Sequence, residues 1–152
     1  MTNSVLRHVM ADFPKFTFTK ADDFSWQPKE RTVSYNPEAA GADLLLLHEL
    51  AHATLGHIRA ASDVELLKLE AEAWARVKMR LAPKYGVKFN EDFVRIHMDT
   101  YRNWLHTRSL CPKCDSTGWQ IDNNRYRCPN CLATWRVNPA KHKRIKRVLD
   151  KK

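Results

Sequence analysis

The chain has 152 residues, of which 43% are hydrophobic and 28% charged, and its formal net charge is +9. This length and hydrophobic content suit one compact domain with a small appendage, and they exclude a chain that is disordered throughout. The first residues form no apolar stretch with a cleavage site, and no apolar run approaches the ~20 residues of a membrane span. We therefore expect a soluble, cytoplasmic protein with no membrane partner.

The positive charge is concentrated near the C-terminal end. Residues 1–110 carry 15 Lys/Arg and 14 Asp/Glu, whereas residues 136–152 carry eight Lys/Arg and one acidic residue. Such a tail can contact the phosphates of DNA or RNA, because that attraction does not depend on sequence. The alternative is a solvated terminus that aids only solubility. The candidate nucleic-acid contacts in the tail are Lys141, Lys143, Arg144, Lys146 and Arg147.

The first 55 residues predict two short strands and a helix. Residues 16–19 and 32–35 alternate apolar with polar or β-branched side chains, as half-buried strands do. Asp43 is a candidate N-cap for a helix that runs to about Leu55, and Gly56 follows where a glycine commonly ends a helix. This helix contains the sequence HELAH.

Two more helices are predicted further along the chain. Ser62 and Glu65 form a capping box that starts a helix expected to end before Pro83. Asn90 can cap a third helix over residues 91–106, where apolar side chains recur at helical spacing. After this helix the pattern changes to two cysteine knuckles joined by a hairpin with an Asp-Asn-Asn turn.

The HELAH sequence places candidate metal ligands on one face of a helix. His48 and His52 are four residues apart, so their side chains lie about one turn apart on the same face. This spacing suits Zn²⁺, with Glu49 beside it as a carboxylate that takes a proton from water. Apart from Glu49 the run from Leu44 to Leu55 is uncharged, so we expect the helix to be buried. Two histidines and a glutamate would be costly to bury there without a shared partner. A chance match on an ordinary helix is the alternative.

A catalytic zinc of this kind needs a third protein ligand. Glu70 lies at the centre of an apolar stripe on its helix, whereas Glu72 lies on the opposite, charged face. Buried carboxylates are rare unless paired or bound to metal, so Glu70 is the predicted ligand and Glu72 the alternative. On a continuous helix His57 would point about 140° away from the ligand face, and we expect it to interact with the helix dipole instead. His97 and Tyr101 are candidates to stabilise the oxyanion, and a core position is the alternative for His97.

These motifs resemble a known family. The segments VSYNPEAAGADLLLLHELAHATLGH and LEAEAWARVKMRLAP, about a third of the chain, are similar to minimal gluzincin-type metallopeptidases of the ImmA/IrrE kind and their relatives on mobile elements. The resemblance implies a strand beside the active-site cleft. It also implies zinc held by His48, His52 and a glutamate that matches Glu70, with Glu49 as the base. Four positions after the glutamate ligand the family usually has Asn or an acidic residue, where this chain has Trp74.

All four cysteines lie in two C-x-x-C pairs within 21 positions. In a reducing compartment such pairs indicate metal before disulfide. A short hairpin can bring the pairs together as a tetrahedral site, and four cysteine ligands leave no open position, so we predict a structural zinc. The predicted ligands are Cys111, Cys114, Cys128 and Cys131.

The aromatic residues of this segment allow two interpretations. Trp119, Tyr126 and Trp135 either pack beneath the ribbon or join a cationic surface that stacks on single-stranded nucleic acid. The arginines of that surface would be Arg125, Arg127 and Arg136. The order of an HExxH domain, a ribbon and a basic tail also resembles SprT/Spartan-like proteases, which act on DNA-bound proteins. Those enzymes usually carry a His-Gly pair after the motif, and this sequence has none.

Together these patterns predict an α+β protein with three parts. The parts are a small zincin-like metallopeptidase domain over residues 1–108, a zinc ribbon over 109–137 and a basic tail over 138–152. The expected function is zinc-dependent hydrolysis of peptide bonds in a protein substrate, including one bound to nucleic acid, with Glu49 as the base for a zinc-activated water. The alternative is a non-enzymatic nucleic-acid or protein-binding adaptor whose two metals are structural.

Overall fold

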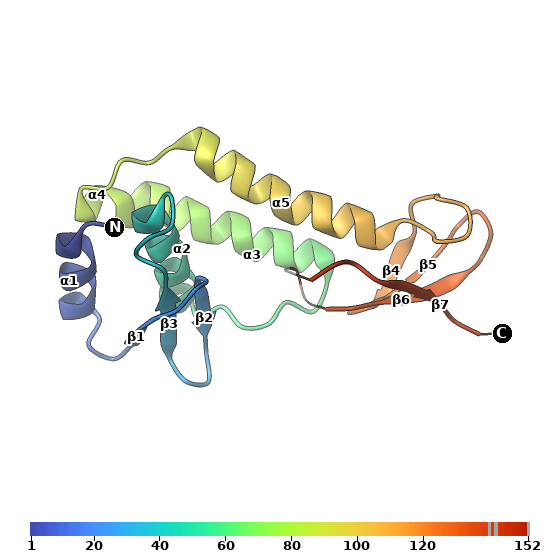
Figure 1. Ribbon diagram of the computed structural model, residues 1–152, viewed down its shortest axis with the longest axis horizontal. Helices are drawn as coiled ribbons and strands as arrows, with labels where there is room; N and C mark the ends of the chain where they lie inside the picture. Colours follow the sequence, from blue (N-terminus) through green and yellow to red (C-terminus); the bar gives the residue numbers. More distant parts are fainter. Residues whose placement is uncertain (140, 142, 152) are drawn as a thin grey trace. The chain divides into compact units, whose positions relative to one another are not determined.

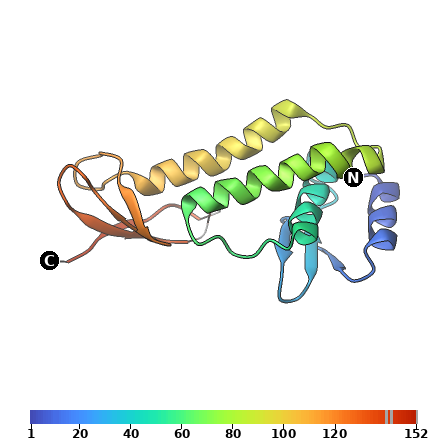
Figure 2. The same ribbon diagram turned by 180° about the vertical axis from the view of Figure 1, so that it is seen from behind.

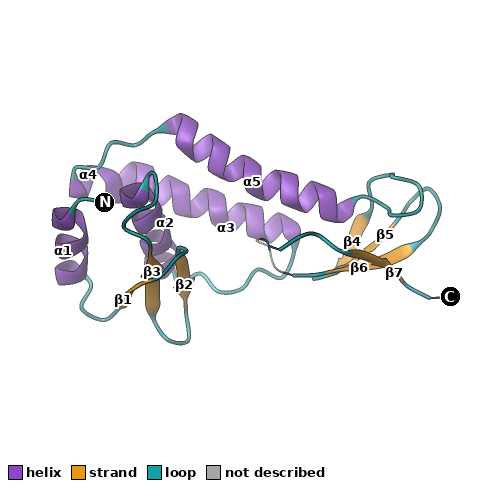
Figure 3. Ribbon diagram, viewed as in Figure 1, coloured by secondary structure: helices purple, strands orange, loops and turns teal. Residues whose placement is uncertain are grey.

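The structure, a computed structural model, describes residues 1–139, 141 and 143–151. Its fold is α+β, as the sequence predicts (Figure 1 and Figure 3). The helices are α1 (Asn3–Asp12), α2 (Ala42–Leu55), α3 (Asp63–Arg76), the π-helical turn η1 (Val77–Leu81), α4 (Ala82–Tyr85) and α5 (Glu91–Ser109). The strands are β1 (Thr17–Lys20), β2 (Ser25–Gln27), β3 (Thr32–Tyr35), β4 (Trp119–Asp122), β5 (Arg125–Arg127), β6 (Thr134–Val137) and β7 (Arg147–Leu149).

The chain divides into two compact units. The first comprises Met1–Arg59 and Leu69–Val94, and the second comprises Ala60–Lys68 and Arg95–Lys152. The division falls within α3 and α5, and the predicted domain boundaries after residues 108 and 137 stay predictions. Within the described part of the chain, no helix has the length and hydropathy that crossing a membrane requires.

The first unit contains a three-stranded sheet with the strand order β1-β3-β2. β1 runs parallel to β3 and β2 runs antiparallel to it, so that Phe18 and Trp26 both lie opposite Val33. The sequence predicts β1 and β3 but not β2, which has only three residues. α2 packs against β2 and β3 (Figure 2). An edge strand therefore lies beside the helix that carries HELAH.

α2 is buried on nearly all sides. Leu46, Leu47 and Leu50 have no exposed surface, as expected for a helix that is apolar all round. The helix ends as predicted at Gly56, which takes a left-handed conformation with a φ of 68°. This burial fixes the helix firmly in the core of the first unit.

The start of α2 differs from the prediction. Its N-cap is Gly41, whose φ of 69° is left-handed and where a Cβ would collide with the ring of Phe93. The prediction that Asp43 is the N-cap is wrong, because its carboxylate accepts hydrogen bonds from the backbone N–H and the hydroxyl of Thr2. A contact distant in sequence thus overrides a local capping signal.

Two predicted helix starts are confirmed by hydrogen bonds. The backbone N–H of Glu65, in the first turn of α3, donates to the Ser62 hydroxyl at 3.1 Å. The backbone N–H of Phe93 donates to the Asn90 side chain at 3.0 Å, at the start of α5. Both bonds satisfy N–H groups that a helix leaves without internal partners.

The helix that begins with α3 continues beyond its predicted end. The prediction that it stops before Pro83 is wrong, because the backbone stays helical through η1 and α4 to Tyr85. In η1 the N–H of Ala82 donates to the carbonyl of Val77, five residues back. This wider turn directly precedes the proline, which has no N–H of its own to bond.

The second unit contains an antiparallel sheet with the order β4-β5-β6-β7. Its hairpin, β4 and β5, is predicted by the sequence, whereas β6 and β7 are not. Tyr126 and Trp135 stack at 5.8 Å between ring centroids and are almost fully buried. The Trp135 indole N–H donates to the carbonyl of Arg108 at 3.0 Å, so α5 and β6 share this small core.

Candidate metal centres

Three predicted ligands of the first unit converge on one point. His48 Nε2 lies 2.9 Å from Glu70 Oε2, His52 Nε2 lies 3.2 Å from Glu70 Oε1, and the two Nε2 atoms are 3.1 Å apart. Nitrogen and oxygen ligands around a tetrahedral zinc ion lie ~3.3 Å from one another. The donors and their spacing therefore fit a metal ion, and His48 and Glu70 belong to a group that could hold one.

The three side chains are buried. The exposed fractions are 1% for His48, 9% for His52 and 4% for Glu70. Burial alone would raise the pKa of Glu70, but hydrogen bonds with the two histidines outweigh it and hold that pKa well below its usual range. Burial alone would lower the pKa of His52, but the bond and the charge of Glu70 outweigh it and raise that pKa. Glu70 is thus a buried carboxyl group between two imidazoles, where a cation would stabilise its charged form.

The predicted base, Glu49, is half-buried and follows His48 on α2. Burial raises its pKa, and the nearby charges of His48 and His52 oppose this rise in part. The backbone N–H of Trp26 also favours the charged form of this carboxylate. β2, which the sequence does not predict, therefore contributes to the surroundings of Glu49. A carboxyl group with a raised pKa is suited to take up and release a proton near neutral pH.

Trp74 supports His48 from the side. The two rings stack with centroids 4.2 Å apart and an interplanar angle of 22°. Trp74 is buried and lies four residues after Glu70, one turn along α3. The sequence marks this position as a departure from the family pattern but does not predict that its side chain packs on a ligand. The spacing of four residues places Trp74 on the same helix face as Glu70, and this is the signal from which the contact could be predicted.

His57 contacts the candidate site, contrary to the prediction that it points away. That prediction assumes a continuous helix, whereas Gly56 reverses the chain and the N–H of His57 donates to the carbonyl of His52. His57 Nδ1 then lies 2.8 Å from His52 Nδ1, and His57 Nε2 lies 3.2 Å from Glu72 Oε2. Glu72, the alternative third ligand, thus pairs with His57, whereas Glu70 pairs with His48 and His52. Burial and the charge of His52 lower the pKa of His57.

The two candidate oxyanion stabilisers lie on α5 in the second unit. The rings of His97 and Tyr101 are 5.7 Å apart between centroids. The Lys141 ammonium lies 3.3 Å from the centroid of the Tyr101 ring and donates a hydrogen bond to the Thr100 hydroxyl. The role of His97 and Tyr101 in stabilising an oxyanion stays a prediction.

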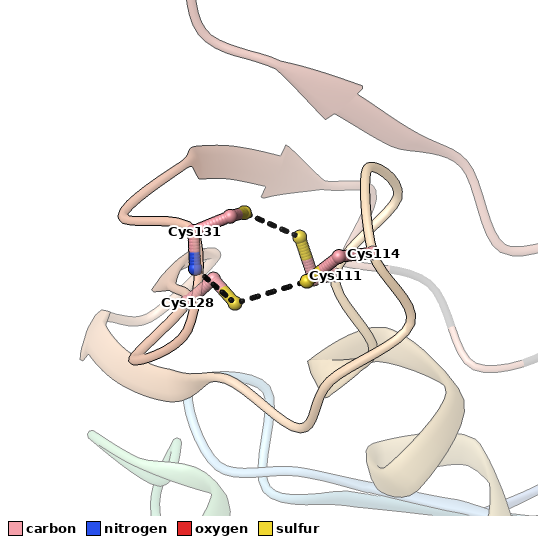
Figure 4. A group of neighbouring side chains, drawn as sticks. All are labelled: Cys111, Cys114, Cys128 and Cys131. Atoms are coloured by element: carbon pink, nitrogen blue, oxygen red, sulfur yellow. Dashed lines mark hydrogen bonds between the residues drawn. The ribbon is translucent and has the colours of Figure 1, made fainter.

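The four cysteines of the second unit form a compact cluster (Figure 4). Cys111 Sγ lies 3.6 Å from Cys131 Sγ, and Cys114 Sγ lies 3.5 Å from Cys128 Sγ. Sulfur ligands around a tetrahedral zinc ion lie ~3.8 Å apart. Backbone N–H groups of Lys113 and Cys131 and the Asn130 amide point at three of these sulfurs, as they would at thiolates. Hydrogen bonds from Ser116 also lower the pKa of Cys114. The cluster could hold a metal ion.

The aromatic residues of the ribbon divide between its two faces. Tyr126 and Trp135 are buried, as the packing interpretation predicts, whereas Trp119 is 47% exposed. In the sheet Trp119 lies opposite Arg127, and residues directly opposite each other share a face. Arg125, two residues before Arg127, lies on the same face opposite Arg136, and Thr134 lies opposite Arg127.

Several candidate nucleic-acid contacts of the ribbon and the tail are engaged within the second unit. Asp150 accepts from Arg125 at 2.6 Å and lies 3.4 Å from Arg136. Arg147 donates to the carbonyl of Leu110 at 2.7 Å. In the tail, the exposed candidates are Lys143, Arg144 and Lys146. The predicted tail, 138–152, includes residues 140, 142 and 152, which lie outside the described residues.

No protein-family model matches this chain, and neither a curated protein nor a solved structure matches it. The residues of the chain itself therefore carry the argument. Among those that the structure describes, two groups could hold metal ions, a His/Glu group and a four-cysteine cluster, and the fold is α+β.

Proposed function

We propose that the protein is a zinc-dependent metalloendopeptidase that hydrolyses peptide bonds in a protein substrate. The observation that carries the proposal is the convergence of His48, His52 and Glu70, with Glu49 beside them on α2. Two imidazoles and one carboxylate are ligands that suit zinc. Three protein ligands also leave one position open for water or substrate, which a catalytic zinc requires.

The side chains of the chain have distinct roles in this proposal. When bound, zinc supplies Lewis-acid activation of water and of the scissile carbonyl. The Glu49 carboxylate accepts a proton from the attacking water and later donates it to the leaving amine. The backbone N–H of Trp26 favours the charged form of that carboxylate. β2 is an edge strand, so an extended substrate peptide can pair with it next to Glu49.

The proposal is tested with Glu49→Gln and His48→Ala in the full chain. A mixture of proteome-derived peptides serves as substrate, and mass spectrometry maps the new termini. Glu49→Gln should retain the metal and lose cleavage, because glutamine fills the same space but cannot accept the proton. His48→Ala should lose both the metal and cleavage. Peptide cleavage at the wild-type rate by Glu49→Gln would show that the proposed mechanism is wrong.

We also propose nucleic-acid binding by the exposed face of the ribbon, which would bring the peptidase to substrates on DNA or RNA. The observation that favours it is one sheet face carrying Trp119, Arg127 and Arg136, a stacking ring among cations. Affinity for a labelled single-stranded oligonucleotide should fall steeply with salt and with Trp119→Ala. The same binding with no peptidase activity in any assay would favour the adaptor function instead.

A further inference from the structure

His52 makes a hydrogen bond through the ring nitrogen that faces away from the candidate metal site. Its Nε2 faces Glu70 and His48, while its Nδ1 lies 2.8 Å from Nδ1 of His57. Nε2 of His57 in turn lies 3.2 Å from Oε2 of Glu72. A hydrogen-bonded chain of two imidazoles and one carboxylate therefore starts at His52, through the ring nitrogen that faces away from the candidate metal site.

The protons in this chain have a single arrangement that permits metal binding. A ring nitrogen that binds a metal carries no hydrogen, so a metal on His52 Nε2 leaves the hydrogen on Nδ1. That N–H donates to Nδ1 of His57, which must then be an acceptor. The hydrogen of a neutral His57 is accordingly on Nε2, where it donates to the carboxylate of Glu72.

The opposite arrangement is disfavoured by Glu72. If the hydrogen of His52 were on Nε2, it would occupy the position of the metal, and His57 would have to donate from Nδ1. The unprotonated Nε2 of a neutral His57 would then face the Glu72 carboxylate, and two acceptors at 3.2 Å repel each other. The carboxylate therefore selects the tautomer of His52 that can bind a metal.

The backbone around His57 holds the chain of bonds in place. Gly56 ends α2 in the left-handed conformation, and the N–H of His57 donates to the carbonyl of His52 at 3.0 Å. The indole N–H of Trp26 donates to the carbonyl of His57 at 3.1 Å. Only 9% of the His57 surface is exposed. The ring of His57 is thus fixed against His52 by bonds from α2 and β2.

We propose that His57 and Glu72 are positioning residues that orient His52 and fix its tautomer for metal binding. This inference rests on the metal site of the proposed function. One helix then serves both sides of His52, because Glu70 and Glu72 both belong to α3. Removing a residue that hydrogen-bonds to a metal ligand typically weakens metal binding by roughly 10–100-fold.

The test measures metal affinity in the full chain with the ribbon metal retained. Zn²⁺ is titrated into the first site in competition with a chromophoric chelator, for wild type, His57→Ala, Glu72→Ala and Glu72→Gln. His57→Ala should weaken binding roughly 10–100-fold. Glu72→Ala should weaken it less, and Glu72→Gln should recover part of the loss, because the amide oxygen can still accept from His57. Glu38→Gln, an exposed glutamate on another element, is the matched control and should bind as wild type does.

A second readout separates orientation from general stability. With Co²⁺ in the first site, the visible absorption band should change shape in His57→Ala, because the orientation of the His52 ring changes. Glu72 is exposed, so its variants keep the test valid if His57→Ala fails to fold. Unchanged affinity and an unchanged Co²⁺ spectrum in both Glu72 variants would overturn the inference. A wild-type chain that binds no metal at the first site would instead overturn the proposed function.

Discussion

The two candidate metal groups differ in what holds their ligands in place. His48, His52 and Glu70 project from helices, and 22 positions separate His48 from Glu70. Around them α2 contributes aliphatic residues that are fully buried in the core of the first unit. The cysteines lie on the loops of a small sheet whose core consists of little more than Tyr126, Trp135 and the cysteines themselves.

This difference predicts opposite responses to metal loss. A helix packed in an apolar core keeps its structure when a ligand is removed, because burial supplies most of its stability. A segment with so small a core depends on its metal, since metal binding and folding are then the same event. This contrast fits the proposed function, in which the His/Glu group holds a catalytic metal and the cysteine cluster a structural one.

The largest expected effect is the loss of the ribbon in Cys128→Ser. Structural zinc contributes an apparent binding free energy of about 10–16 kcal/mol in small zinc domains. Removing one ligand should therefore abolish amide protection in β5 and β6, measured by hydrogen exchange with mass spectrometry. His48→Ala is the matched comparison and should leave protection in α2 largely intact. Equal protection of β5 in Cys128→Ser and wild type would break the contrast between the two groups.

A smaller effect is expected at Trp74, which supports the His/Glu group by stacking on His48. Trp74→Ala opens a cavity in the first unit and should lower the free energy of unfolding by about 3–5 kcal/mol. Trp74→Phe keeps a stacking ring and should retain most of that stability and of the metal affinity. Urea unfolding and chelator competition measure the two quantities. Weaker metal binding in Trp74→Phe than in Trp74→Ala would contradict a stacking role.

The smallest effect concerns the ribbon's exposed face. Asp150 pairs with Arg125 and Arg136, so its carboxylate competes with phosphate groups for these two guanidinium groups. Asp150→Asn should raise the affinity for a single-stranded oligonucleotide modestly and steepen its salt dependence. Asp99→Asn makes the same charge change and releases Arg102, which lies on α5 and not on the sheet. Equal effects of the two substitutions, measured by fluorescence anisotropy, would argue for net charge alone.

The sequence brings out the local parts of both candidate metal groups. The C-x-x-C pairs and HELAH predict candidate ligands by spacing alone, because each motif depends on one loop or one helix turn. Helical periodicity also separates Glu70 from Glu72, since only Glu70 lies in the apolar stripe of its helix. These inferences need no knowledge of tertiary structure.

The residues that the sequence misses are those positioned by tertiary contacts. β2 has three residues and no clear alternation, yet pairing with β3 brings Trp26 to Glu49. His57 returns to His52 because Gly56 takes a left-handed conformation, which a helical wheel does not represent. β6 and β7 are equally short and exist through pairing with their neighbours.

The most direct test of the account is the amount of zinc bound per chain in three purified full-length proteins. The wild type should bind two zinc ions, one at each group. Glu70→Ala should bind close to one and keep the ribbon folded, whereas Cys128→Ser should lose the ribbon zinc and keep the other. A Glu70→Ala variant that still binds two ions, or a wild type that binds only the ribbon zinc, would contradict a metal site at His48, His52 and Glu70.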